Sequence, residues 1–364
     1  MKLGKVSENC LKRSVLRQIH PVRKELVCGA GVGEDCAIFS FPTEDFPTEI
    51  FPAETFPTEV FSAEKVSAGK LVASCVQEAA VAAGEISGGG PEPVLTLAQL
   101  IQKGANNLAA GGAEPLAAVI ALLLPEHAEE KDIKALMAEA QEKCEELDLQ
   151  IAGGQTRVSG AVTMPVATVT VFGRADHRFC GGKASPGQDV VVSKWIGLQG
   201  TAILARRFRD KLFARYPAYL IDEAAGFDRY LSIIPEAATA MKSGVCAMHD
   251  VSEGGIFGAL WELAERAGVG LTIDMKKLPL RQETVEVCEC CNVNPYTLLS
   301  GGSLLMTAED GQGLAAALAA EHIPAVVVGK VTDSRDRLLI NGEEVRYLDR
   351  PQGDEIYSIS SVMR

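Results

Sequence analysis

The sequence lacks three features that would place it in common functional classes. It has no run of lysine and arginine, no apolar stretch long enough to span a bilayer, and no charged-then-apolar leader at Met1–Lys5. Its 35 Lys and Arg against 48 Asp and Glu give a net charge of −13, whereas proteins that bind phosphate backbones present clustered cations. We therefore expect a cytoplasmic protein that takes a small-molecule substrate and binds neither nucleic acid nor membrane.

The ten cysteines do not form a recognisable disulfide or zinc pattern. They are scattered through a long chain without a secretion signal, which favours reduced and mostly buried thiols. One cluster, Cys288–Cys291, contains a Cys-x-x-Cys spacing, but a structural zinc site needs four ligands and no second pair follows at a matching spacing. We expect these cysteines to be buried thiols on a helix, and the alternative is a role in metal binding or redox chemistry.

A chain of 364 residues with 47% apolar content is longer than one core usually serves. A connector rich in glycine and proline, Gly181–Gly187, separates two regions in which strands and helices alternate. We predict two α+β domains, spanning residues 1–180 and 181–364. Hydrophobic patterning predicts strands at residues 116–124, 162–172, 189–193, 271–274, 303–307, 325–329 and 337–340. It predicts helices at residues 131–147 and 200–208 and in a segment that starts at Gly254-Gly255.

Residues 41–70 repeat a five-residue unit that begins Phe-Pro and decays toward its end. Proline at every fifth position blocks helix, and a period of five suits neither a strand nor a helix. We expect a disordered acidic insertion between two strands that grew by tandem duplication. The alternative is that the repeated phenylalanines dock on a partner, with the globular part as a platform.

Five short segments combine glycine with acids or amides: Gly31–Asp35, Asn106–Gly112, Gly153–Arg157, His249–Gly255 and Ser300–Gly302. Glycine allows backbone N–H groups to approach an anion closely, and neighbouring carboxylates or amides can hold a divalent cation. The segments therefore predict turns that surround one phosphate-handling cleft.

In order and spacing, these segments resemble the superfamily of aminoimidazole ribonucleotide (AIR) synthetase, selenophosphate synthetase, thiamine-monophosphate kinase and the carbamoyl-dehydrating hydrogenase-maturation protein. Gly33–Ile38 is similar to the family's Gly-Asp/Glu-Asp-Ala-Ala-Val, and Asn106–Pro115 to its Asn-Asp helix end. Gly153–Thr156 resembles Gly-Gly-Asp-Thr. His249–Gly255 and Asn294–Leu305 resemble segments of the hydrogenase-maturation branch. The likeness runs nearly end to end and omits the Phe-Pro repeat.

This resemblance implies an α+β, two-domain PurM-like fold in which an N-terminal α/β domain pairs in a homodimer and a C-terminal α+β domain follows. ATP would lie in a groove beside the barrel-like dimer interface. Active members of the superfamily phosphorylate an oxygen of an amide, carbamoyl, phosphate or selenide substrate, with magnesium held by aspartates.

The chain departs from the family pattern at several acids. Val76 stands where a strand usually ends in a magnesium-binding aspartate, and Asn107 and Gln155 replace two more aspartates. Asp35 is left nearly alone, and amide oxygens offset little of the charge on phosphates. Glu78 or Glu85 could supply a replacement. The terminal residues Ser358–Arg364 contain no cysteine to carry a carbamoyl group, so that activity is not expected.

Matching the chain to the family gives a set of candidate site residues. Lys194, His249 and Asp250 are the catalytic candidates, and Asp35 and Asn107 are the candidates for a weakened Mg²⁺ site. The nucleotide-binding candidates are Gly33, Glu34, Asp35, Asn106, Asn107, Gly153, Gly154, Gln155, Thr156, Arg157, Ser252, Glu253, Gly254 and Gly255.

Each candidate has a structural alternative. Asp35, Asp250 and Ser252 could cap a turn or a helix, and Asn106 and Asn107 could cap a helix end. Arg157 could form an ion pair at the surface, and Lys194 could be a solvated lysine beside a core tryptophan. His249 could be an imidazole that is hydrogen-bonded to the backbone.

Two functions follow. The first is an ATP-binding protein that activates an oxygen of a small amide or carbamoyl compound by phosphorylation. The second is a catalytically degenerate nucleotide-binding or structural dimer that acts as a sensor or maturation partner, which the missing acids favour.

Overall fold

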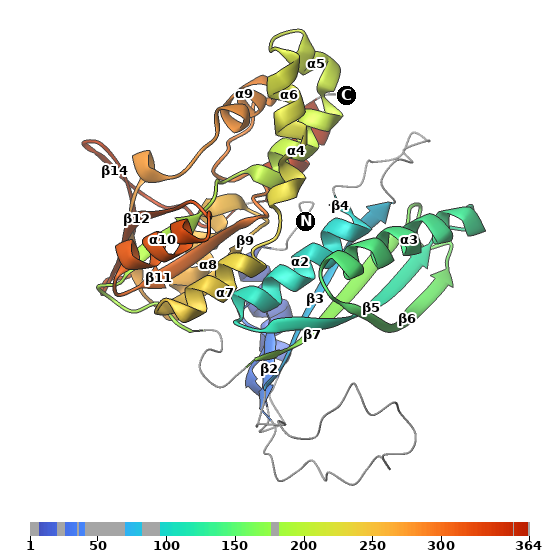
Figure 1. The fold of residues 1–364 in the computed structure, drawn as a ribbon, viewed down its shortest axis with the longest axis horizontal. Helices are drawn as coiled ribbons and strands as arrows, with labels where there is room; N and C mark the ends of the chain where they lie inside the picture. The colour runs from blue at the N-terminus through green and yellow to red at the C-terminus, as the bar shows by residue number, and fades with distance from the viewer. Residues whose placement is uncertain are drawn as a thin grey trace.

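Two mixed β-sheets, each with its own helices, make up most of the molecule (Figure 1). The computed structural model describes residues 7–19, 26–34, 36–40, 70–81, 95–175, 182–351 and 353–362. Strands β1–β7 form the first sheet and strands β8–β14 form the second. Both halves combine sheet and helix, which confirms the α+β prediction. The predicted boundary at 180 and 181 falls outside the described residues, so it stays a prediction.

The first sheet has the strand order β1-β2-β3-β7-β5-β6, with β4 paired to β3. Helices α2 (Leu97–Ala110) and α3 (Glu130–Glu146) cover one of its faces (Figure 1). The α2 helix lies so close that a Cβ on Gly104 would come within 2.6 Å of the Val171 side chain. The strands are β1 (Leu26–Cys28), β2 (Ala37–Ser40), β3 (Lys70–Val81), β4 (Leu95–Thr96), β5 (Glu114–Leu124), β6 (Gln150–Val158) and β7 (Val166–Ala175).

The second sheet has the order β14-β13-β10-β12-β8-β11-β9, and its strands β8 and β11 are buried on both faces. In β8 (Asp189–Ser193), Val190 and Val192 pack with helix α8 (Gly255–Ala267), whereas Val191 packs with α7 (Ile234–Lys242) and α10 (Gly311–Ala320). This alternation is why the strand reads as a continuous apolar run. The other strands are β9 (Val245–Val251), β10 (Gly270–Asp274), β11 (Ser303–Ala308), β12 (Ala325–Thr332), β13 (Arg337–Asn341) and β14 (Glu344–Tyr347).

A lobe of helices projects from the second sheet (Figure 1). It contains α4 (Leu198–Arg207), α5 (Arg209–Phe213), α6 (Ala218–Ala225) and α9 (Gln282–Cys291). Cys288, Cys290 and Cys291 are buried on α9, and burial raises the pKa of Cys288 to about 12 and that of Cys291 to about 11. The expectation of core thiols on a helix is confirmed.

The remaining described helical segments lie at the two ends of the chain and between strands. They are α1 (Glu8–Cys10), η1 (Leu11–Val15), η2 (Leu16–Gln18), η5 (Phe227–Tyr230), η6 (Met275–Lys277) and α11 (Glu355–Val362). Within the described ranges, no helix combines the length and hydrophobicity needed to cross a bilayer.

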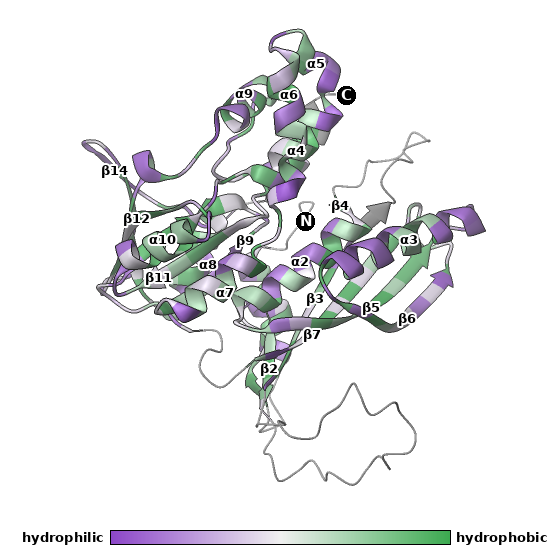
Figure 2. Ribbon diagram, viewed as in Figure 1, coloured by the Kyte–Doolittle hydropathy of each residue, from purple (hydrophilic) through white to green (hydrophobic). Residues whose placement is uncertain are grey.

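The predicted elements agree with the structure except in four places. Residues 106–110, predicted as part of a turn, form the last part of helix α2. Figure 2 shows hydrophobic residues along the strands of both sheets, as their patterning predicted. The strand predicted from residue 162 begins instead at Val166. His249 and Asp250 lie in strand β9 rather than in a turn. Gly153–Arg157, predicted as a turn, belongs to strand β6. Of the Phe-Pro repeat, residues 41–69 lie outside the described residues.

Side chains from both domains hold the loop at residues 230–233, where the domains meet. Asn106, on α2, donates from Nδ2 to the Leu231 carbonyl at 2.7 Å and accepts from the Ile233 N–H at 3.2 Å. Lys194, which follows β8, donates from Nζ to the carbonyls of Tyr230 at 2.8 Å and Ser232 at 2.6 Å. Because successive backbone groups of the loop bond to opposite domains, the loop fixes their relative position.

Replacing Asn106 with alanine should destabilise the protein by roughly 2–4 kcal/mol, because a buried carbonyl and a buried N–H would lose their partner. Denaturant unfolding followed by circular dichroism measures this loss. The exposed Asn341 provides the control, since Asn341→Ala should change stability by less than about 0.5 kcal/mol. Equal effects of the two substitutions would show that the loop bonds do not join the domains.

Candidate functional site

In the structure, the predicted site residues lie in separate groups and do not surround one cleft. One group lies on the middle of α8, a second at the domain junction around the loop 230–233, and a third at the start of α8. The segment Gly153–Arg157 lies apart from all three, on strand β6. Each group is described in turn.

The turn at Gly33-Glu34 packs on the middle of α8. Gly33 has a φ of +75°, and a Cβ there would lie 2.6 Å from the Glu262 carbonyl oxygen, so both its conformation and its surroundings require glycine. Glu34 forms an ion pair with Arg266 at 2.9 Å and accepts a hydrogen bond from the Cys28 thiol at 3.1 Å. Burial and Glu34 raise the pKa of Cys28 to about 11, so this thiol stays protonated. Asp35 lies outside the described residues, and its predicted role stays a prediction.

His249 is buried in strand β9 and joins the same group. Its Nε2 lies 3.1 Å from a carboxylate oxygen of Glu262 on α8. The observed partner is a carboxylate, whereas the structural alternative expected a backbone group. A shallow recess lined by Lys183, His249 and Arg266 opens beside this pair. A catalytic role of His249 stays a prediction.

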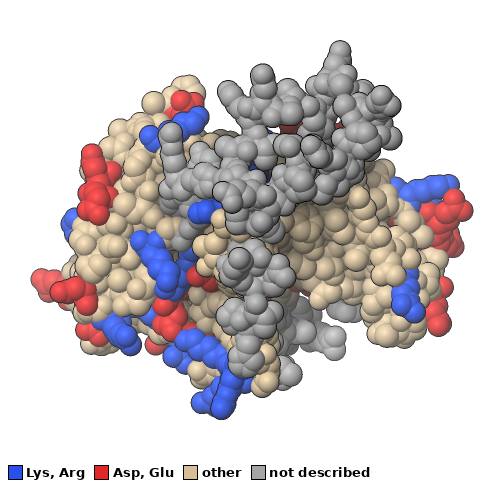
Figure 3. All heavy atoms as spheres, turned by 90° about the horizontal axis from the view of Figure 1, so that it is seen from below, with Lys and Arg blue, Asp and Glu red and all other residues tan. Residues whose placement is uncertain are grey.

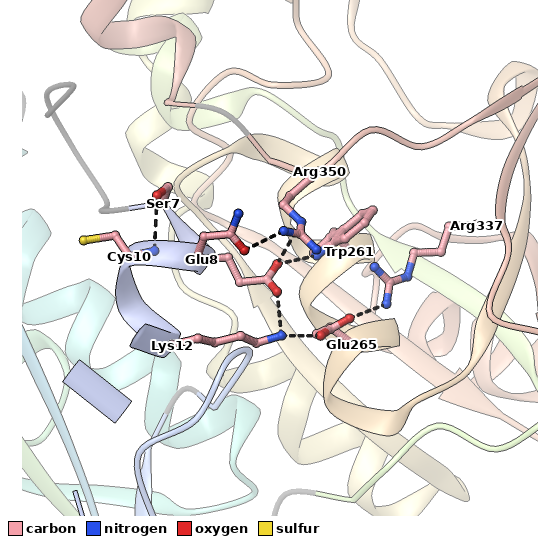
Figure 4. Close-up of polar contacts among 9 residues, drawn as sticks. Ser7, Glu8, Cys10, Lys12, Trp261, Glu265, Arg337 and Arg350 are labelled. Carbon is pink, nitrogen blue, oxygen red and sulfur yellow. Dashed lines mark hydrogen bonds and ion pairs between the residues drawn. The ribbon is translucent and has the colours of Figure 1, made fainter. Parts of the chain in front are cut away.

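The N-terminal segment is anchored to the same helix by a charged network (Figure 4). Lys12 lies between Glu8 at 2.6 Å and Glu265 at 2.5 Å, and Arg337 bonds to the other oxygen of Glu265 at 2.7 Å. Trp261 donates to Glu8 at 2.9 Å, and the guanidinium of Arg337 lies 3.8 Å from its ring centre. Lys12 and Arg337 lower the pKa of Glu265 to about 2.

The second group lies at the domain junction, where two candidates, Asn106 and Lys194, hold the loop at residues 230–233. Lys194 uses its three donors on Tyr230, Ser232 and the Glu236 carboxylate, which lies 2.5 Å away. Burial lowers the pKa of Lys194 even though Glu236 and Asp250 favour its charge. Its φ of 52° is unusual for a residue with a side chain. Asp250 is buried beside it on β9. The catalytic roles of Lys194 and Asp250, and a nucleotide contact by Asn106, stay predictions.

The third group, at the start of α8, is built by two glycines and an acid from the C-terminus. Gly254 and Gly255 have φ values of +85° and +63°. A Cβ on Gly255 would lie 2.5 Å from the Tyr296 carbonyl oxygen, so the turn is pressed against residues 296–298. Asp354 accepts hydrogen bonds from the N–H groups of Gly254 at 2.6 Å, Leu299 at 3.1 Å and Ile356 at 2.8 Å.

Three backbone N–H groups at this helix start have acceptors within the protein. Gly254 donates to Asp354, Gly255 to the Ser252 carbonyl, and Phe257 to the Tyr296 carbonyl. An anion at this turn would therefore replace a protein acceptor. The nucleotide-binding roles of Ser252, Glu253, Gly254 and Gly255 stay predictions.

Helix α11 connects this turn to the first domain. The Tyr357 hydroxyl donates to a carboxylate oxygen of Glu78 on strand β3 at 3.2 Å. Burial and the nearby carboxylates Glu253 and Glu78 raise the pKa of Tyr357 far above its usual value. The junction therefore brings together acids from both domains, including Glu78, one of two residues considered as a replacement for the missing aspartates. The other, Glu85, lies outside the described residues.

Of the two predicted magnesium ligands, Asn107 lies within the described residues and Asp35 does not. Asn107 donates from its amide to the Ser74 hydroxyl at 2.9 Å. Among the described residues, no three His, Cys, Asp or Glu side chains are placed to hold a metal ion. A metal role of Asn107 stays a prediction.

Gly153–Arg157 lies at the outer edge of the first sheet. Strand β6 pairs only with β5, and β5 and β7 separate it from β3, where Ser74 and Glu78 lie. Residues Gly153, Gly154, Gln155, Thr156 and Arg157 are all exposed. A Cβ on Gly154 would lie 1.8 Å from the Ile120 carbonyl oxygen, so this glycine permits close strand pairing. Nucleotide contacts by this segment stay predictions.

The sequence interpretation missed Asp354, Tyr357, Glu236 and Glu262. None of the four lies in a glycine motif, and each has a partner that lies from 13 to 279 positions away along the chain. The acid at 354 lies 100 residues from Gly254. Only the pairing of an isolated acid with a glycine-rich helix start could have suggested it, and many acids would have fitted equally well.

Models of two protein-family domains match the chain in order. The N-terminal domain of AIR synthase related protein matches residues 93–175, and the C-terminal domain of AIR synthase related protein matches residues 185–340. The first match covers α2 to β7, and the second covers most of the second sheet.

Curated relatives share part of their length with this chain. Carbamoyl dehydratase HypE of Rhodobacter capsulatus is 31% identical over 234 residues, which are 62% of this chain and 66% of that protein. Thiamine-monophosphate kinase of Halobacterium salinarum is 27% identical over 65% of this chain and 77% of the kinase. The chain thus spans just under two thirds of that HypE.

Solved structures share the fold. E. coli HypE, a hydrogenase maturation protein, superposes with a TM-score of 0.64 at 22% identity, over 79% of this chain and 88% of that one. A HypE in complex with ATP gives a TM-score of 0.64 at 18% identity, over 79% and 87% of the two chains.

The charged network around Glu265 generates a prediction. The pKa of Glu265 is lowered on folding, so its stabilisation is present above about pH 4.5 and is lost as the pH falls toward 2. Glu265→Gln should remove about 1 kcal/mol of stability at pH 7 and shift the emission of Trp261, measured in a Trp195→Phe background. The exposed Glu142 supplies the control Glu142→Gln. An equal loss at pH 7 and at pH 2 would contradict this account.

Proposed function

This chain belongs to the AIR synthase-related protein family, and from that premise we propose that it binds ATP at the junction of its two domains. The observation that supports this most is the meeting of β3 with the start of α8 across helix α11, through Tyr357 and Glu78. Segments that carry the family's glycine motifs flank this junction, and a HypE of the same fold binds ATP. A cytoplasmic location remains a prediction.

For an active family member, the chemistry would be transfer of the ATP γ-phosphoryl group to an oxygen of a small amide or carbamoyl compound. Such a transfer depends mainly on positioning and on neutralising the charge that spreads over the phosphoryl oxygens. HypE is a carbamoyl dehydratase and thiamine-monophosphate kinase is a kinase, so relatives of this chain perform two different reactions. The substrate class assigned to this chain follows the resemblance to HypE.

The described residues favour the second candidate, a nucleotide-binding protein with little or no phosphoryl transfer. They contain no three side chains placed to hold a metal ion, and Asn107 and Gln155 carry no charge. Without a cation held by a cluster of ligands, a site lacks the group that would neutralise the developing charge. Such a protein would act as a nucleotide sensor or a maturation partner.

Calorimetric titration with ATP, with and without Mg²⁺, separates these candidates when it is combined with an assay of ADP release over a panel of amides and carbamoyl compounds. We expect ATP to bind, more tightly with Mg²⁺ because Glu78 and Glu253 would repel the free nucleotide. We expect ADP release at the background rate. Release that depends on one compound of the panel would support transfer instead, and a lack of binding would exclude both candidates.

We also propose that two copies pair through the sheet face that α2 and α3 leave uncovered. The strand register places Cys75, Thr170, Val119 and Gly153 in one row across this face, whereas Val76 and Val171 lie on the opposite face, against Gly104 of α2. Figure 3 shows little charge on the described surface of this domain, apart from its outer end. Leu71, on the same face, is 40% exposed. An uncharged face beside an open edge strand is a surface that a second chain would cover.

Thr170→Arg should convert the dimer to a monomer, because it places a charge in the middle of the proposed interface. Light scattering coupled to gel filtration measures the mass. Cys75, exposed in the single chain, should react with a thiol reagent several-fold faster in this variant than in the wild type. The control Tyr219→Arg, at a side chain 75% exposed on α6, should leave the mass and the reaction rate of Cys75 unchanged. A wild-type monomer with a fully reactive Cys75 would refute the pairing.

A further inference from the structure

We propose that Asp354 is a positioning residue for the proposed nucleotide site, because its carboxylate joins the start of α8, the loop before β11 and the C-terminal helix α11 into one unit. This inference rests on the proposed function and adds a residue outside every glycine motif. Asp354 contacts backbone only and acts through the turn at Ser252–Gly255.

The first argument is the number of donors that converge on one side chain. Asp354 is only 3% exposed and accepts three backbone N–H groups, from Gly254, Leu299 and Ile356. One oxygen takes Leu299 and Ile356, and the other takes Gly254. A carboxylate offers about four acceptor positions on two oxygens, whereas an asparagine has a single acceptor oxygen and an NH₂ group. The arrangement therefore disfavours the amide, whose NH₂ group would face the Gly254 N–H.

The second argument is that two of these donors belong to glycine segments or directly precede them. Gly254 precedes α8 in the segment that matches the family motif, and Leu299 precedes Ser300–Gly302, another of the glycine segments. The Ser252 carbonyl accepts from both the Gly255 and the Ser300 N–H groups, so the two segments already touch. Asp354 adds a second connection between them and fixes their spacing.

The third argument is how α11 itself is held. Ile356 and Ile359 are buried in the hydrophobic cluster that also contains Leu298 and Leu299. Tyr357, on the same helix, reaches Glu78 on the first domain. The helix is therefore anchored by apolar contacts, while its polar groups reach one glycine turn and one strand on opposite sides of the junction.

The charges around Asp354 give this arrangement a pH dependence. Burial and the charge of Glu253 raise its pKa to about 6, against the hydrogen bonds that lower it. The titratable groups nearby are Glu253 from the α8 turn, Tyr357 from α11 and Glu78 from β3 behind Tyr357. The raised pKa means that this group's contribution to global stability is present below about pH 4 and is lost as the pH rises through 6. The strength of the hydrogen bonds to the turn follows the opposite course, since an ionised carboxylate is a stronger acceptor than the neutral acid.

The test compares wild type with Asp354→Asn, using Asp349→Asn as the control at an exposed acid in the same segment. Protection of backbone amides against hydrogen exchange is measured at Gly254 and Leu299, and the Kd of a non-hydrolysable ATP analogue is measured from pH 5 to 8. We expect Asp354→Asn to lose protection at Gly254, to keep it at Leu299, and to bind the analogue about tenfold more weakly at pH 7. Affinity in the wild type should fall as the pH drops through 6, and this inflection should be absent in Asp354→Asn.

Three outcomes would overturn the inference: unchanged protection at Gly254, an unchanged pH profile of binding, or tighter binding by Asp354→Asn, which would mean that the carboxylate competes with the phosphates. If the wild type binds no analogue, the proposed function fails, and protection at Gly254 still tests the positioning role. If Asp354→Asn does not fold, the wild type at pH 5 and pH 7 gives the same comparison of protection.

Discussion

The structure depends on one constraint, which is that every buried backbone group of the loop at residues 230–233 must find a hydrogen-bond partner where the two domains meet. Asn106 supplies partners from the first domain and Lys194 supplies them from the second. Each side chain uses its polar atoms fully, so rotating one domain against the other would leave several of them unpaired. This fixes β3 relative to α8, and the contact between Tyr357 and Glu78 requires that position.

Local patterns in the sequence were enough to locate the secondary structure. The apolar runs at β5 and β8 and the helical periodicity of α3 arise from burial of one or both faces, which neighbouring residues encode. The segment Gly153–Arg157 was misjudged because adjacent glycines commonly mark turns. Here glycine serves close pairing between strands, since a Cβ at Gly154 would strike the backbone of Ile120. A single sequence does not distinguish these two uses of glycine.

The candidate site was harder to predict because its partners are distant along the chain. Resemblance to the family selected the glycine segments, but not which of their polar groups are already committed within the protein. Asn106 bonds to a residue 125 positions away, and Asp354 to one 100 positions away. Such pairs leave no periodic signal. The family likeness therefore identified the segments, and the structure showed that three of them form different groups along α8 and the domain junction.

The acids at the junction limit how a nucleotide could be held there. Glu78, Glu253 and Asp354 surround Tyr357, and burial together with these negative charges raises the pKa values of Tyr357 and Asp354. Neutral N–H donors would stabilise a triphosphate bound in this region, and each carboxylate that it faces would destabilise it. Asn107, which bonds to Ser74 on β3, stands in place of an aspartate; the change removes an anchor for a cation and also negative charge that a cation would otherwise have to offset. The same substitution that weakens phosphoryl transfer therefore makes binding of a nucleotide without a resident metal easier to sustain.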